Sequence, residues 1–156
     1  MGGSIYSRFG FSDVLTMFLA LNASVELYKG GVVPLAEYAQ RPYDRDILVR
    51  VLVPKENARF VYQSVRNSQT DFPVLTCAAA KLADGSIRAA IGARPGKAVL
   101  YTAAPEAGET AEEFAARFAA EVKADIKTES NLRGGAEYRR HLASVLTKRA
   151  VCRLEG

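Results

Sequence analysis

The stretch from Phe72 to Tyr101, FPVLTCAAAKLADGSIRAAIGARPGKAVLY, is the part of the sequence that defines the fold class. Its apolar runs predict three strands, over 72–82, 86–92 and 97–101. Asp84-Gly85 between the first two strands is a strong signal for a two-residue hairpin turn. Pro95-Gly96 marks a second turn before the third strand. Three strands joined by short turns predict an antiparallel meander.

A helical period replaces the strand pattern after this meander. Thr110 and Glu113 have the spacing of a capping box. The apolar residues that follow recur every four positions and predict a helix over 111–126: Phe114, Phe118, Val122 and Ile126. A last helix is predicted over 135–151, with Tyr138, Leu142, Val145 and Leu146 facing inward. Strands followed by helices indicate an α+β architecture.

The residues before the meander predict a smaller unit of mixed structure. Met1 to Phe11 is rich in Gly and Ser and is predicted to be irregular, and Ser12 is a suitable N-cap for a helix over 13–22. Strands are predicted over 24–29, 32–33, 46–54 and 59–65, with a helical turn at 34–38. Residues 54–57 resemble a linker. We therefore predict two domains, residues 1–55 and residues 56–156, the second built on a three-stranded antiparallel sheet packed with helices.

The composition excludes several classes of protein. The chain has 156 residues, of which 49% are hydrophobic, and a net charge of +4, which excludes a disordered protein. Its longest apolar stretch, 14–27, is interrupted by polar residues and is too short for a membrane span. The absence of a signal-like start and of a disulfide framework predicts a cytoplasmic protein. The basic charges do not form one stripe, so no nucleic-acid partner is expected.

Side chains suited to catalysis are scarce. His141 is the single histidine, and Cys77 and Cys152 are far apart, so no metal site is predicted. Cys77 lies in an apolar strand and is expected to be a buried, inert thiol. No catalytic residue is assigned, and any chemistry would come from a cofactor. Gly2-Gly3-Ser4 offers backbone N–H groups that an anion can approach, although the same residues are equally compatible with a cloning remnant.

Short motifs along the chain resemble one known family. They are GGSI (2–5), SDVL (12–15), LALNA (19–23), DILVRV (46–51), IGARP (91–95) and NLRGGAEYRR (131–140), together with Tyr62, Gln63, Arg66 and Asp71 at their spacing within 62–71. Together they resemble the FAD-binding (medium) subunit of the molybdenum hydroxylases, which include xanthine dehydrogenase and carbon monoxide dehydrogenase. The resemblance implies that residues 1–55 are the second half of an FAD-binding domain. Residues 56–156 then correspond to the C-terminal domain of that subunit.

The resemblance also implies an FAD site made of eight residues: Gly2, Gly3, Ser4, Ile5, Asp13, Ile47, Leu48 and Gln63. The first four would bind the pyrophosphate through backbone N–H groups. Leu48, with Ile47 beside it, would lie against the isoalloxazine ring. Asp13 is otherwise only part of a helix cap, and Leu48 is otherwise only a core residue. Tyr138 is expected to anchor the last helix to the sheet, and Arg139 and Arg140 to face solvent or a partner.

The family's architecture implies partners and an electron path. Electrons would come from an iron–sulfur subunit, after substrate oxidation on a molybdopterin subunit, and FAD would pass them to an acceptor such as NAD⁺. Two departures from the family pattern lie at the site: Ser4 replaces an Asn, and Gln63 replaces a Lys. The family's N-terminal FAD subdomain is also missing from this sequence.

We therefore expect weak or no FAD binding by this chain alone, and no activity of the isolated chain. The surface left by the missing subdomain is expected to be apolar and to favour a homodimer. The alternative hypothesis is a non-catalytic interaction module that docks to the partner subunits and binds no flavin.

Overall fold

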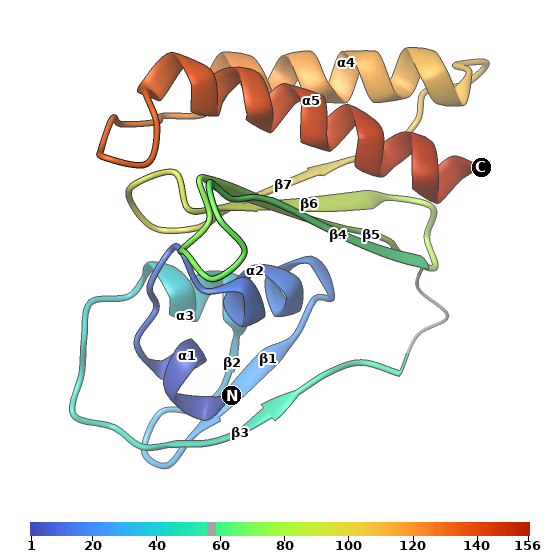
Figure 1. Cartoon of the computed structure of the whole chain (residues 1–156). Helices are drawn as coiled ribbons and strands as arrows, with labels where there is room; N and C mark the ends of the chain where they lie inside the picture. Colours follow the sequence, from blue (N-terminus) through green and yellow to red (C-terminus); the bar gives the residue numbers. More distant parts are fainter. Residues whose placement is uncertain (56–58) are drawn as a thin grey trace.

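The computed structural model describes residues 1–55 and 59–156, which form stacked layers of helices and sheets (Figure 1). The central layer is a four-stranded antiparallel sheet in the order β4-β5-β6-β7. Its strands are β4 (Arg59–Val65), β5 (Leu75–Lys81), β6 (Ile87–Gly92) and β7 (Val99–Ala103). Two long helices, α4 (Ala111–Asp125) and α5 (Ala136–Glu155), cover one face of this sheet.

The N-terminal elements form a smaller lobe on the opposite face of the central sheet (Figure 1). Its helices are α1 (Gly2–Tyr6), α2 (Asp13–Ala20) and α3 (Leu35–Gln40). Its strands are β1 (Ser24–Leu27), β2 (Gly31–Pro34) and β3 (Leu48–Leu52), which pair antiparallel in the order β2-β1-β3. Helix α2 lies between this outer sheet and the central one.

Small side chains allow the central sheet to be covered on both faces. Along β5 the side chains alternate, so that Cys77 and Ala79 join the core under α4 and α5. Ala78 and Ala80 point the other way, into the core that contains α2. Alanine leaves room for the α2 backbone to approach, and the hydroxyls of Thr16 and Thr76 meet there at 3.3 Å.

The α+β class is confirmed, and the central sheet differs from the prediction in one strand. It has four strands rather than three, because β4 pairs along its whole length with β5, from Arg59 opposite Lys81 to Val65 opposite Leu75. A nine-residue connection, 66–74, joins these two strands instead of a tight turn, so no hairpin signal in the sequence predicts that they pair. The capping box on α4 is confirmed, with Thr110 and Glu113 bonded reciprocally.

The first eleven residues are more ordered than predicted. Residues 2–6 form helix α1 despite two glycines, which are poor helix formers. Ile5 explains this difference, because its side chain is fully buried in the core of the N-terminal lobe. Tertiary packing therefore stabilises a helix that local propensity does not favour.

The two lobes share a hydrophobic core. Ala78, Ala80, Ala90 and Ala98 of the central sheet and its loops pack with buried residues from the first 39 positions. The predicted linker at 54–57 falls partly outside the described residues, which leave out 56–58. The domain boundary after residue 55 stays a prediction, and no break in packing separates the lobes on its two sides.

Two predictions for the start of α5 were wrong. Tyr138 is half exposed and does not anchor the helix. Arg139, predicted to face solvent or a partner, is fully buried instead. Its guanidinium donates to the carbonyls of Val74, Glu129 and Gly134 and to the side chain of Asn131. Arg140 is exposed, as predicted.

In the described part of the chain, no helix is long and apolar enough to cross a membrane.

Candidate functional site

Two adjoining hollows lie on either side of α1. The larger hollow has a volume of about 620 Å³ and lies between Gly3-Ser4, the start of α2 and the 66–73 loop. The smaller hollow has a volume of about 420 Å³ and is lined by Gly2, Gly3, Tyr6, Asp46, Ile47 and Leu48. Gly3 lines both, so the two hollows meet at the first turn of the chain.

Asp13 is held on the wall of the larger hollow by residues of β4 and the loop after it. The hydroxyl of Tyr62 donates to one carboxylate oxygen at 2.5 Å, and Arg66 donates to the other at 2.6 Å. Burial, followed by the hydrogen bond to Asp13, raises the pKa of Tyr62, so the hydroxyl remains a donor. A carboxylate has further lone pairs, so Asp13 can still accept a hydroxyl group from a ligand.

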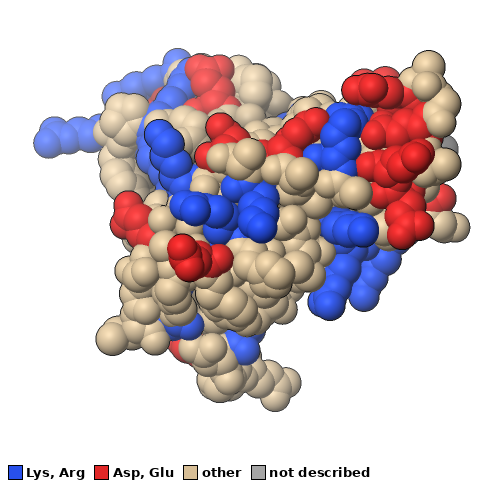
Figure 2. Space-filling model, turned by 90° about the horizontal axis from the view of Figure 1, so that it is seen from above, with Lys and Arg blue, Asp and Glu red and all other residues tan. Residues whose placement is uncertain are grey.

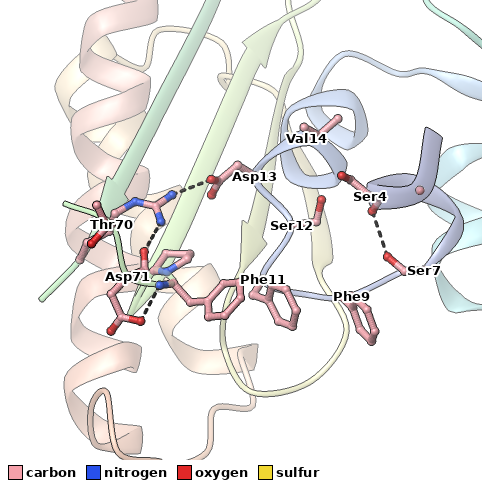
Figure 3. A pocket seen from close by; sticks show the side chains of 13 residues that line it. Ser4, Ser7, Phe9, Phe11, Ser12, Asp13, Val14, Thr70 and Asp71 are labelled. Carbon is pink, nitrogen blue, oxygen red and sulfur yellow. Dashed lines mark hydrogen bonds and ion pairs between the residues drawn. The ribbon is translucent and has the colours of Figure 1, made fainter. Parts of the chain in front are cut away.

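The series of hydrogen-bonded charged side chains that starts at Asp13 and Arg66 continues along the rim of the larger hollow. Arg66 also donates to the carbonyl of Asp71, as drawn in Figure 3, and Arg133 binds the Asp71 carboxylate through two nitrogens at 2.7 and 3.0 Å. The hydrogen bond from Arg133 lowers the pKa of Asp71 below its ordinary value. The rim therefore alternates acid and base, and each arginine already has a carboxylate partner.

Asp46 positions the apolar side of the smaller hollow. Its carboxylate accepts hydrogen bonds from the backbone N–H groups of Lys29, Gly30 and Ile47. The bond from Lys29 is the main reason that the pKa of Asp46 lies below its ordinary value. These bonds tie the turn between β1 and β2 to the start of β3, where Leu48 is half buried and Ile47 is exposed.

A row of aromatic rings lines the other side of the larger hollow. Phe9 and Phe11 are stacked at 5.1 Å between ring centroids, and Phe11 meets Phe72 at 4.6 Å. Figure 3 shows the rings of Phe9 and Phe11 side by side, with Ser12 and Asp13 following along the chain. All three rings are exposed by 40% or more, so a flat apolar ligand can reach them.

The structure brings most of the sequence-predicted site residues together, and it places two of them elsewhere. Gly2, Gly3, Ser4, Asp13, Ile47 and Leu48 line one or both hollows. Ile5 is buried in the core and lines neither hollow. Gln63 points to the opposite face of the central sheet, where its amide donates to the carbonyl of Leu146 on α5.

Sequence reasoning missed the residues that complete the wall and hold Asp13. Tyr62 and Arg66 are 49 and 53 positions away from Asp13, and no short motif reports such a contact. The Phe-Gly-Phe pattern at 9–11 was a visible signal for the aromatic row. It has no helical or strand period, so periodicity predicts no structure for it.

Among the described residues, no cluster of three or more His, Cys, Asp or Glu side chains could hold a metal ion. Cys77 is fully buried as predicted, and burial raises its thiol pKa to about 12. Such a thiol is not a nucleophile near neutral pH.

An α+β protein with two hollows at the first turn of its chain can be compared with known proteins. The family model of the CO dehydrogenase flavoprotein C-terminal domain matches residues 60–154, more than half of the chain. The protein therefore belongs to this family. No match was found among curated proteins.

Solved structures with the same fold cover nearly the whole chain. Carbon monoxide dehydrogenase from Hydrogenophaga pseudoflava matches with a TM-score of 0.80 and 22% identity, over 98% of this chain and 59% of that chain. Quinoline 2-oxidoreductase from Pseudomonas putida 86 matches with a TM-score of 0.77 and 19% identity, over 99% and 59%. Reconstituted CO dehydrogenase from Oligotropha carboxidovorans gives 0.79 and 20%, over 99% and 60%. At these identities the likeness shows the fold, and the chain spans about 60% of the length of these structures.

Proposed function

We propose that this chain supplies one side of an FAD site in a molybdenum hydroxylase. The observation that carries the proposal is the gathering of three separate segments, 2–4, 13 and 47–48, around the two adjoining hollows. These are the segments that the family resemblance assigns to the flavin, and they precede residues 60–154, which the family model matches.

The residues present suit different parts of a flavin dinucleotide. A Cβ built at Gly2 or Gly3 would meet nothing within 4 Å, so the backbone there is open to a phosphate group. The Ile47–Leu48 wall of the smaller hollow suits an apolar ring. The Asp13 carboxylate is an acceptor for sugar hydroxyls. Bound FAD would supply electron transfer, which side chains do not provide.

We infer weak binding of FAD by the chain alone. Arg66 on the wall of the larger hollow is paired with Asp13, and Arg133 next to that hollow is paired with Asp71, so neither arginine is free to neutralise a pyrophosphate. Gln63 lies on the other face of the sheet. Affinity depends on a preorganised site, and this chain offers only part of one.

The wider assignment is also proposed on family grounds. An iron–sulfur subunit and a molybdopterin subunit are the expected partners, with an acceptor such as NAD⁺ at the end of the electron path. The exposed apolar surface of the N-terminal lobe supports self-association as well. Two free cysteines are compatible with a reducing compartment, which supports a cytoplasmic location.

The flavin proposal is tested by titrating the purified chain with FAD. Calorimetry measures the affinity, and the visible spectrum reports a changed flavin environment. Ser4→Asp places a carboxylate beside the glycine backbone, on an exposed residue whose substitution does not touch the core. Because this charge repels a pyrophosphate, we expect at least about tenfold weaker binding.

Ser68→Asp is the matched control, since Ser68 is exposed and lies outside both hollows. It should leave the affinity unchanged. Equal weakening by both variants would show that the effect is not local. A chain that takes up no FAD at all would contradict FAD binding by this chain alone and favour the alternative, a non-catalytic module that docks to the partner subunits.

A further inference from the structure

Within residues 1–55 and 59–156, the outermost strand of the N-terminal lobe has an apolar edge with no strand paired to it. In the sheet order β2-β1-β3, strand β1 occupies only one edge of β3. Figure 1 draws β3 at the lower margin of the molecule, away from the central sheet. Ile47, Val49 and Val53 are 65%, 50% and 42% exposed. An exposed apolar edge of this kind is a template for pairing with another strand.

Exposed apolar side chains are distributed unevenly over the protein. Apart from Phe9 and Phe11 in the larger hollow, those of the N-terminal lobe gather around its sheet and first turn: Met1, Tyr28, Val32, Tyr43, Ile47, Val49, Leu52 and Val53. The opposite face, over α4 and α5, carries mixed patches of positive and negative charge (Figure 2). The other edge of the outer sheet, β2, is blunted because it is four residues long and ends in Pro34. The apolar contact surface is therefore on the β3 side.

We propose that β3 pairs antiparallel with β3 of a second copy of this chain, around a two-fold axis at Arg50. The sequence of β3, LVRVL, reads the same in both directions. A two-fold pairing centred on Arg50 therefore places Leu48 opposite Leu52 of the second copy, and Val49 opposite Val51. Ile47 lies opposite Val53 in the same register. Every pair except the central one is apolar.

The charge at the centre is already compensated within each copy. Arg50 binds Glu26 of the neighbouring strand at 2.5 Å, and these two residues are cross-strand partners. Two opposed arginines alone would be unfavourable. In the proposed pairing the row across the seam reads Glu26, Arg50, Arg50, Glu26, whose charges sum to zero. This charge complementarity favours a second copy over an unrelated apolar strand.

The pairing also bears on the smaller hollow. Leu48 and Ile47 line that hollow, and the second copy would place Leu52 and Val53 beside them. The apolar wall would then be extended by the second copy. The proposal deepens the self-association suggested above and does not depend on flavin binding, since the dimer is measured without FAD.

Sedimentation velocity over a range of concentrations measures the association directly. We expect a dimer for the wild-type chain. Val49→Lys places a charge on the exposed edge and should weaken the dimer at least tenfold. Leu132→Lys is the matched control, because Leu132 is fully exposed on the loop before α5, and it should leave the dimer unchanged. Circular dichroism of each variant verifies the fold.

Cysteine cross-linking tests the register independently of these variants. In a Cys152→Ser background, Arg50→Cys should form a disulfide-linked dimer under mild oxidation, because facing residues in antiparallel strands lie within disulfide range. Cys77 is buried and does not compete. Val32→Cys, an exposed control on β2, should not cross-link.

A wild-type chain that sediments as a folded monomer at every concentration would overturn the proposal, and would leave the edge for a strand of a different polypeptide. A dimer that survives Val49→Lys and does not cross-link at residue 50 would overturn it too. Loss of FAD binding by Ser4→Asp with an intact dimer would separate the two proposals.

Discussion

Arg139 is the residue whose environment differs most from what its chemistry suggests. It is a fully buried cation, and its bonds go to three backbone carbonyls and an asparagine rather than to a carboxylate. Burial lowers the pKa of Arg139, as expected for a cation removed from water. The planar guanidinium offers donors in several directions at once, which lets one side chain hold the loop before α5 against the start of β5.

Arg139→Met should be strongly destabilising, because it leaves the carbonyls of Val74, Glu129 and Gly134 without a donor. We expect a loss of about 3 kcal/mol in the free energy of unfolding, measured by urea denaturation. Arg140→Met on the exposed neighbouring position should change it by less than about 0.5 kcal/mol. Similar values for the two variants would show that the buried bonds are not important for stability.

The ion pair between Glu109 and Arg117 makes the stability of the protein depend on pH in the acid range. Arg117 binds both of its carboxylate oxygens, at 2.8 and 2.9 Å, and this lowers the pKa of Glu109 from 4.5 to about 2. Because the pKa of Glu109 is lowered in the folded state, the stability that this ion pair contributes is complete above about pH 4.5 and is lost as the pH falls toward about 2. The melting temperature of Glu109→Gln should therefore lie below that of wild type at neutral pH and converge with it near pH 2.

Glu112→Gln is the control for this pH dependence, since Glu112 is an exposed residue in the first turn of α4, three positions after Glu109. A plot of its melting temperature against pH should stay parallel to that of the wild type across this pH range. A difference between Glu109→Gln and wild type that stays constant down to pH 2 would contradict the assignment.

At the level of elements, the two long helices begin in different ways. The N-cap of α4 is Thr110, whose side chain accepts from the backbone N–H of Glu113, while Glu113 returns a bond to the N–H of Thr110. Helix α5 begins after Gly135 with no side-chain cap. Its first turn is held instead by Ser130, which accepts from Ala136, and by buried Arg139. The first turn of α4 is therefore stabilised by its own capping residues, whereas the first turn of α5 is stabilised by contacts with the loop before it.

Thr110→Ala should destabilise the protein by about 1 kcal/mol, because it leaves a first-turn N–H of α4 without its acceptor. Thermal or urea unfolding measures this loss. Thr70→Ala, at an exposed loop position, is the control and should be close to neutral. A neutral Thr110→Ala would mean that water replaces the cap without cost.

At the level of the whole molecule, the two lobes are joined by backbone contact as well as by a shared core. The N–H of Ala93, after β6, donates to the carbonyl of Gly10 at 2.5 Å. A Cβ at Gly10 would overlap the carbonyl of Gly96. Glycine at this position therefore allows the segment before α2 to lie directly against the turn between β6 and β7.

Gly10→Ala should force these two backbone segments apart and lower the free energy of unfolding by about 2 to 4 kcal/mol. Urea denaturation followed by circular dichroism measures the change. Gly3→Ala is the stability control, because a Cβ there meets nothing within 4 Å. A stable Gly10→Ala variant would show that the two lobes can shift relative to each other at little cost.

Local patterns predicted the elements well where the signal lay within a few residues. The strand at 59–65 agrees with β4, and the helix predicted over 111–126 agrees with α4, because periodicity and capping are contained in the segment itself. Helix α1 was missed, since its stability comes from burial of Ile5 in a core made by distant residues. The orientation of Gln63 was missed for a similar reason: which face of β4 points toward α5 depends on the pairing of the sheet.

The amino-acid pattern alone was enough to establish the α+β class, the capped helix, the inert buried thiol at Cys77 and the family resemblance. Those properties depend on neighbours in the chain or on composition. Long-range packing determined the pairing of β4 with β5, the burial of Arg139 and the meeting of Gly3, Asp13 and Leu48 around two hollows. Contacts of this kind join residues tens of positions apart, and their free energy exists only once the core that holds them has formed.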